Sequence, residues 1–221
     1  TLLQALSGLL EPQQGSVMLD GVELSHIDPV DVRRDVGLLT QNARLFHGTL
    51  RENLKLGAPL ASDEQLLAAM QVSGGLGFLQ SLPLGLDHMI KEGGLGISGG
   101  QRQSLLLARL SLRQPRVLLL DEPTTAMDEA AERAWIASLR SASAERSVII
   151  STHRMAVLDA VDRLIVLDGG KIYMDGPKDQ VLNALRAQDQ PQPASPAGEP
   201  VARMAKLNLG EALRRARGTE A

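Results

Sequence analysis

The sequence predicts an α/β fold in which a mostly parallel sheet is flanked by helices. Two observations carry this prediction: short apolar runs recur along the chain, and each lies near a segment of helical periodicity. The runs with the character of buried strands are residues 16–20, 35–40, 116–121 and 147–152. Such an alternation of strands and helices is typical of parallel sheets whose strands are connected by helices.

The predicted helices follow in chain order. The chain opens on TLLQALSGLLEP, whose leucines have the spacing of one buried helix face: Leu2, Leu3, Leu6, Leu9 and Leu10. The same periodicity marks residues 63–71, 101–113, 129–140 and 178–187. Within residues 163–176, two strand-like runs flank Gly169 and Gly170, a pair that favours a hairpin turn.

Composition excludes several classes of function. The net charge of −3 and the scarcity of aromatic residues, one Trp, one Tyr and two Phe, give no basis for a nucleic-acid partner. The chain has no cysteine, which excludes disulfides, zinc–thiolate sites and thiol catalysis. No apolar run approaches the roughly 18 to 20 residues that span a bilayer, so a membrane role would be peripheral or supplied by another segment.

The composition changes after residue 188. Residues 189–200, DQPQPASPAGEP, have the prolines and small residues of a flexible linker. Residues 201–221 carry five basic and two acidic residues, and apolar side chains there share one possible helix face: Val201, Ala205, Leu209, Ala212 and Leu213. Gly210 weakens that helix, so two interpretations stay open: a solvated tail, or a helix that binds a membrane surface or a partner.

Two carboxylates follow a strongly apolar strand in RVLLLDEPT. Asp121 and Glu122 would lie at the carboxyl end of that strand, where open α/β sheets bind ligands. Asp121 can hold Mg²⁺, and Glu122, whose side chain points elsewhere, can polarise a water as a general base. The alternative is a strand that merely ends in acidic residues and a turn proline.

A glycine pair stands at the start of a predicted helix in GISGGQRQ. Ser98 and Gln101 have the spacing of a capping box, which is the purely structural interpretation. Gly99 and Gly100 exceed what a cap needs and would let a phosphate approach the helix N-terminus. Capping and phosphate binding are compatible with each other.

Polar residues also end two further predicted strands. His153 follows the strand in SVIISTHR and could contact a γ-phosphate through a ring nitrogen, although a lone histidine is more often structural. Gln41 follows the strand in VGLLTQ, and its amide oxygen could coordinate Mg²⁺ or position a water.

These segments together resemble the motifs of ATP-binding cassette (ABC) ATPases, in the order and at about the spacing of that family. VLLLDEPT resembles Walker B, ISGGQ the signature, TAMD the D-loop, THR the H-loop and LLTQ the Q-loop. The resemblance covers residues 1 to about 188. It implies a P-loop NTPase-like core with a helical signature-motif subdomain at about residues 42–113.

The resemblance also implies ATP and Mg²⁺ as ligands and assigns the roles. Asp121 would bind Mg²⁺, Glu122 would act as the general base, His153 would sense the γ-phosphate, and Gln41 would join Mg²⁺ to the attacking water. The four signature residues would bind the γ-phosphate of ATP that is held mainly by a second nucleotide-binding domain, most simply in a homodimer. They are Ser98, Gly99, Gly100 and Gln101. Asp128 would communicate across that dimer.

The start of the chain also matches the family. There the phosphate-binding loop ends in G-K-S-T or G-K-T-T and runs into a helix of the form T-L-L-x-x-L-x-G-L, so Thr1 would correspond to the last Thr and could contact the α-phosphate. The implied expectation is a domain cut at the end of Walker A, without the N-terminal antiparallel strands, the P-loop and its lysine. Such a chain would bind ATP poorly by itself and hydrolyse hardly any.

Two loops resemble export-type cassettes, at residues 41–54 and 82–101, and Glu92 would meet a transmembrane partner, fused upstream or a separate subunit. Residues 162–185 resemble type I secretion ATPases, which export proteins or peptides from the cytoplasmic face of the bacterial inner membrane. The chain departs from the family at Ile97, Met127, His88 and Lys91. The alternatives are a cassette ATPase acting on DNA or ribosomes, and a nucleotide-binding module that no longer hydrolyses ATP.

Overall fold

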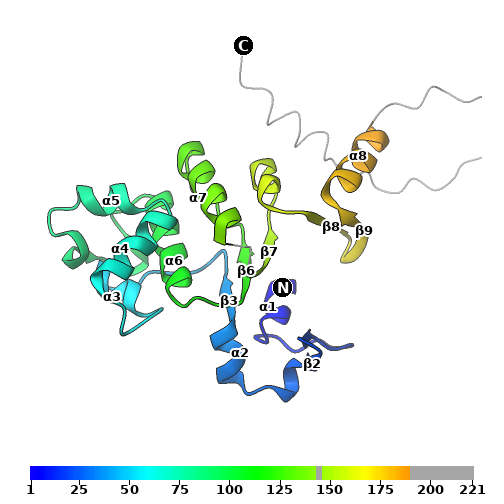
Figure 1. Cartoon of the computed structure of the whole chain (residues 1–221), viewed down its shortest axis with the longest axis horizontal. Coiled ribbons are helices and arrows are strands. Elements are labelled where there is room, and N and C mark those ends of the chain that lie inside the picture. Colours follow the sequence, from blue (N-terminus) through cyan, green and yellow to red (C-terminus); the bar gives the residue numbers. More distant parts are fainter. Residues whose placement is uncertain (143–145, 190–221) are drawn as a thin grey trace, which may run out of the picture. The chain divides into compact units, whose positions relative to one another are not determined.

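The computed structural model describes residues 1–142 and 146–189. These residues form two compact units, Thr1–Ala160 and a second unit that begins at Val161. The first unit contains both helices and strands (Figure 1). No helix in the described part of the chain is long and apolar enough to cross a membrane.

A three-stranded parallel sheet forms the centre of the first unit. It consists of β3 (Val36–Leu39), β6 (Val117–Asp121) and β7 (Ser147–Ser151), with β6 in the middle (Figure 1). Leu39 pairs with Leu120, and Asp121 pairs with Ser151. The predicted strands at residues 35–40, 116–121 and 147–152 are therefore confirmed, and their carboxyl ends meet at one edge of the sheet.

Helices cover β6 on both sides. On one side, Leu119 packs with Leu3 of α1 (Leu2–Leu6) and Val32 of α2 (Pro29–Asp35). On the other, Leu118 and Leu120 join the larger cluster that includes apolar residues of α6 (Gly99–Leu112) and α7 (Glu129–Ala142). This arrangement confirms the predicted α/β class, and α6 and α7 confirm the predicted helices at residues 101–113 and 129–140.

The strand β7 is less buried than predicted. Its side chains alternate between half-buried and exposed, and Ile149 is 43% exposed. The reason is position, because β7 is an edge strand of the described sheet whereas β6 has a neighbour on each side.

The first 23 residues differ from the sequence predictions. The helix α1 ends at Leu6, and of the five predicted leucines only Leu3 is buried. Gly8, at φ +74°, lies just beyond its end, and the chain turns there. The predicted buried strand at residues 16–20 is also wrong: β1 (Met18–Leu19) pairs antiparallel with β2 (Val22–Glu23), and Met18 is exposed.

The cause of this second error is local turn chemistry. Asp20 (φ +50°) and Gly21 (φ +80°) have the positive φ values of a two-residue hairpin loop. Asp-Gly is a strong signal for that turn, and it outweighs the apolar character of the three residues before it. The short 3₁₀ helix η1 (Leu24–His26) follows β2 and leads to α2.

A helical region lies between β3 and the end of α6. In chain order it contains β4 (Gly48–Thr49), α3 (Leu50–Lys55), α4 (Asp63–Val72), α5 (Leu76–Ser81), η2 (Gly85–Asp87), β5 (Met89–Ile90) and η3 (Glu92–Gly94). The predicted helix at residues 63–71 is confirmed as α4. Leu50, Leu66, Met70 and Leu105 are nearly inaccessible and pack α3 and α4 against α6.

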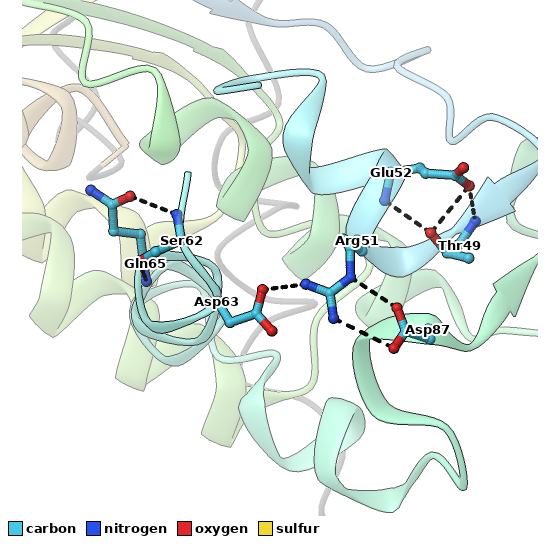
Figure 2. Close-up of polar contacts among 7 residues, drawn as sticks. All are labelled: Thr49, Arg51, Glu52, Ser62, Asp63, Gln65 and Asp87. Atoms are coloured by element: carbon cyan, nitrogen blue, oxygen red, sulfur yellow. Dashed lines mark hydrogen bonds and ion pairs between the residues drawn. The ribbon is translucent and has the colours of Figure 1, made fainter. Parts of the chain in front are cut away.

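Figure 2 shows the polar contacts at the outer side of this region. Arg51 bridges Asp63, at the start of α4, and Asp87 of η2, whose Oδ1 accepts from Arg51 Nε at 2.8 Å. The Arg51 guanidinium lowers the pKa of Asp87 below its usual value. Because β4 pairs with β5, the segment after Gln41 and the segment before the signature are joined by backbone and side-chain bonds.

The second unit contains a hairpin and a helix. The strands β8 (Arg163–Asp168) and β9 (Lys171–Pro177) are antiparallel, with positive φ at Gly169 and Gly170, so the predicted hairpin is confirmed. The helix α8 (Lys178–Asp189) confirms the predicted helix at residues 178–187. Asp189, the first residue of the predicted linker at residues 189–200, belongs to this helix, and the rest of the linker and the predicted tail lie outside the described residues.

Candidate functional site

The catalytic candidates lie where β6 ends. After Asp121 the backbone turns at Glu122, which has φ +50°, a left-handed conformation that is uncommon for a residue other than glycine. Glu122 N donates to Ser151 O at 2.9 Å, so the turn is fixed to the end of β7. The strained backbone is therefore held by the neighbouring strand.

The Glu122 carboxylate is held by three side chains. His153 Nδ1 lies 2.8 Å from Glu122 Oε1, and the hydroxyls of Thr125 and Thr152 donate to Oε2 at 3.1 and 3.4 Å. The Glu122 side chain is mostly buried, at 16% exposed, whereas that of His153 is 74% exposed. The structure thus brings together two residues that are 31 positions apart and were singled out separately in the sequence.

Thr125 and Thr152 were not predicted. Thr125 stands three residues after Glu122 in DEPTT, and Thr152 immediately precedes His153. Their signal in the sequence was a hydroxyl residue within three positions of each predicted catalytic residue.

Asp121 and Gln41 are placed at the same edge of the sheet. Asp121 is half-buried opposite Ser151. Gln41 is exposed two residues beyond the end of β3, whose last residue, Leu39, pairs with Leu120. The described residues contain no cluster of three or more acidic, His or Cys side chains able to enclose a metal ion. One carboxylate and one amide oxygen fit Mg²⁺, which commonly keeps its waters and takes further ligands from phosphate groups.

The signature residues begin α6. Ser98 Oγ accepts from Gln101 N at 3.2 Å, and Gln101 Oε1 accepts from Ser98 N at 2.8 Å, which completes a capping box. A Cβ on Gly99 would lie 3.1 Å from Ala126 Cβ, and one on Gly100 only 2.9 Å from Ala126 O. The glycine pair therefore has a packing role that sequence analysis missed: it lets α6 approach the D-loop backbone.

A pocket of about 420 Å³ opens at this contact. Its walls include the four signature residues Ser98–Gln101, the D-loop residues Ala126–Asp128, and Gly74, Gly75 and Phe78 before and within α5. Asp128 Oδ1 accepts from Ala131 N at 2.8 Å and so caps α7. Phe78 and the two glycines had no signal in the sequence as site residues.

The predicted site residues thus form two groups in the described part of the chain. Asp121, Glu122, His153 and Gln41 lie at the strand ends, and none of them lines the pocket that contains Ser98–Gln101 and Asp128. Thr1 is exposed and makes no side-chain cap to α1, although α1 itself packs beside β6. The strand-end group and the signature group therefore do not share this pocket.

A parallel α/β sheet with carboxylates at the end of its central strand and a capped, glycine-containing helix is typical of nucleotide-binding proteins. Residues 1–125 match the family model described as ABC transporter, and the chain belongs to this family. The predicted resemblance is thereby confirmed.

Individual proteins agree with this assignment. The chain is 36% identical over 200 residues to the cyclolysin secretion/processing ATP-binding protein CyaB of Bordetella pertussis, covering 90% of the chain and 28% of CyaB. It is 38% identical over 184 residues to the mycobactin import ATP-binding/permease protein IrtB of Mycolicibacterium thermoresistibile, covering 83% of the chain and 32% of IrtB.

A solved structure, a bacterial Atm1-family ABC exporter with ATP bound, superposes with a TM-score of 0.82 at 27% identity, covering 100% of the chain and 35% of that protein. The chain therefore spans about a third or less of these proteins.

Proposed function

We propose that this chain supplies the ATP-hydrolysing part of an ABC exporter. The observation that carries the proposal is the Glu122 carboxylate, held at the end of a parallel strand 2.8 Å from His153 Nδ1. Support comes from the ATP-binding proteins it resembles, among them CyaB, named for secretion, and the Atm1-family exporter. IrtB is named for import, so the direction of transport rests on the exporter-like segments at residues 41–54 and 82–101.

The strand-end group can perform phosphoryl transfer to water. The Glu122 carboxylate, aimed by Thr125 and Thr152, accepts a proton from the attacking water. His153, with one ring nitrogen on Glu122, presents the other to the γ-phosphate of ATP. Asp121 and Gln41 would hold Mg²⁺, which when bound offsets the phosphate charge. Thr1, exposed at the start of α1, would contact the α-phosphate.

The strand-end group and the signature group do not share a pocket, which supports an enzyme made of two copies. The signature residues Ser98–Gln101 and Asp128 face a pocket of their own, so a second nucleotide-binding domain would bring its signature to ATP held at the first. We infer a homodimer in which ATP joins the two copies and hydrolysis separates them.

A transmembrane domain is the second proposed partner, fused to the cassette or present as a separate subunit. Phe46 and Leu56 are exposed apolar residues on the wall of a second pocket, of about 310 Å³, together with His47, Glu52 and Asn53. Glu92 is also exposed, close in the chain to β5. The cassette would then work at the cytoplasmic face of a bacterial inner membrane, on a protein or peptide substrate of the kind that type I secretion exports.

The test is Glu122→Gln in the assembled transporter. We expect ATP to bind and hold the two cassettes together, while steady-state hydrolysis falls by about 10² to 10⁴-fold because the proton acceptor is lost. Glu129→Gln is the matched control, since Glu129 is an exposed glutamate on α7, and it should leave hydrolysis unchanged. Rapid steady-state turnover by Glu122→Gln would contradict the proposed function.

A further inference from the structure

The residue after His153 is anchored at three points. Arg154 N donates to Thr152 Oγ1 at 3.1 Å, Arg154 O accepts from Val157 N at 3.3 Å, and Arg154 Nη2 donates to Glu132 Oε2 at 2.6 Å. His153 itself is exposed, and its side chain contacts Glu122. The position of the His153 backbone therefore depends on the fixed residues on either side of it.

Glu132 is an unusual partner for this arginine because it is buried. Its side chain is 4% exposed, and that of Arg154 is 28% exposed. Among the described residues, Glu132 Oε1 has no hydrogen-bond partner. A buried ion pair seldom stabilises a fold more than apolar residues of the same size would, and a half-satisfied carboxylate is a particularly costly choice. Stability alone gives little reason for this pair.

Glu132 also has a specific place on α7. It lies one turn after Asp128, and Glu132 N donates to Asp128 O at 2.9 Å. Asp128 both caps α7 and lines the pocket of the signature residues. One helical turn and one ion pair thus connect the D-loop to the loop that carries His153.

We propose that the Glu132–Arg154 ion pair is a positioning device that sets the His153 loop against the D-loop end of α7. Arg154 and Glu132 are then positioning residues for hydrolysis: they act through His153 and contact no substrate. A shift of Asp128, caused by a second copy at the signature pocket, would pass through the first turn of α7 and move His153 relative to Glu122. The effect on hydrolysis rests on the proposed function, whereas the effect on the position of His153 does not depend on it.

The chain offers a matched pair of variants. Glu132→Met with Arg154→Met replaces both charges by unbranched apolar side chains, which leaves no unpaired buried charge. Glu129→Met with Arg133→Met removes an exposed ion pair, at 3.3 Å, from the same helix. Neither double variant should unfold at a clearly lower urea midpoint than the original chain.

The geometric test uses the imidazole ¹⁵N signals of the 221-residue chain. The Nδ1 atom of His153 contacts Glu122, and we expect the His153 ¹⁵N signals to shift away from their original positions in Glu132→Met/Arg154→Met. The signals of the other three histidines, and of His153 in the Glu129→Met/Arg133→Met control, should not change. Unchanged His153 signals in the folded variant would overturn the proposal.

A second variant keeps the test decisive if the double variant does not fold. Arg154→Lys retains the charge but replaces the planar guanidinium, which donates to Glu132 through Nη2, by a compact ammonium group. It should also shift the His153 signals, by less than the double variant does. Full retention of the His153 signals in Arg154→Lys would then overturn the proposal.

The catalytic test is made in the assembled transporter. Glu132→Met/Arg154→Met should lower kcat about ten- to a hundredfold, the cost of a small misplacement of a catalytic group, with the KM for ATP changed less than twofold. Equal losses in kcat and ATP affinity would indicate a merely structural pair and contradict the positioning role. An original transporter that hydrolyses no ATP would instead refute the proposed function and leave the His153 measurement standing.

Discussion

Two helices of this chain begin with the same polar motif and differ in what lies inside it. In α4, Ser62 Oγ accepts from Gln65 N at 3.3 Å and Gln65 Oε1 accepts from Ser62 N at 2.9 Å (Figure 2). In α6 the same two bonds join Ser98 and Gln101, at 3.2 and 2.8 Å. The enclosed residues are Asp63-Glu64 in the first box and Gly99-Gly100 in the second.

The two enclosed residues distinguish a helix start that is only capped from one that is also open to an anion. At α4 the helix N-terminus has its own negative charges, and Asp63 pairs with Arg51, so the positive end of the helix dipole is already compensated. At α6 the first turn has no acidic residue, and its glycines face a pocket and the D-loop. The capping box fixes where each helix starts, and the two residues inside it decide whether that start is free to receive a phosphate.

Gly100→Ala is the substitution that should disturb the start of α6 most. Alanine normally stabilises a helix relative to glycine, by about 0.5–1 kcal/mol, but here the added Cβ would lie 2.9 Å from Ala126 O, a backbone atom that cannot move aside cheaply. We expect a net loss of about 1–3 kcal/mol in the free energy of unfolding, measured by urea denaturation of the chain.

The control for Gly100→Ala is the equivalent position of the other box. Glu64 is exposed, so Glu64→Ala should change the free energy of unfolding by no more than about 0.5 kcal/mol. A Gly100→Ala chain as stable as the original would show that the glycine pair is there for a ligand alone and not for contact with the D-loop.

Removal of the serines tests the shared part of the two boxes. Ser62→Ala and Ser98→Ala should each cost about 1 kcal/mol of stability, because each leaves a helix N–H without its capping oxygen. The two variants should differ in function: in the assembled transporter, Ser98→Ala should also weaken ATP-dependent association of the cassettes, and Ser62→Ala should not. Equal association by both variants would restrict Ser98 to a capping role.

The sequence predicted the elements whose signal is local and strong. The strand β6 is a continuous apolar run buried between two neighbours, and the β8–β9 hairpin has two glycines at its turn. Prediction failed where a short turn competed with an apolar run, at Asp20-Gly21, and where burial depended on the number of neighbouring strands, at β7. Neither property can be obtained from periodicity alone.

The candidate site shows the same limit. The types and order of its residues were available from motifs, but contacts across the chain were not: Glu122 meets His153 only because β6 and β7 pair with Asp121 opposite Ser151. The packing of Gly100 on Ala126 and the pairing of Glu132 with Arg154 join residues more than 20 positions apart. No periodicity or local motif links such positions, so they became visible only in the fold.

A third capping box allows a test with a small but selective effect on stability, because one of its two residues, Glu52, is a titrating carboxylate. In α3, Thr49 pairs with Glu52 rather than with a glutamine: Thr49 N donates to Glu52 Oε2 at 2.7 Å (Figure 2). Hydrogen bonds from the Thr49 backbone and hydroxyl lower the pKa of Glu52 below its ordinary value of 4.5.

A carboxyl whose pKa is lower in the folded state than in the unfolded state stabilises the fold above the unfolded value and loses that contribution as the pH falls through the folded value. The α3 cap should therefore weaken below about pH 4.5, whereas the glutamine boxes of α4 and α6 should not.

Urea midpoints measured between pH 6 and pH 3 should fall less in Glu52→Gln than in the original chain. The reciprocal change, Gln65→Glu, should fall more, because it gives the α4 box the titrating group that α3 has. Parallel pH profiles for all three chains would mean that the Thr49–Glu52 bonds contribute nothing to stability in solution.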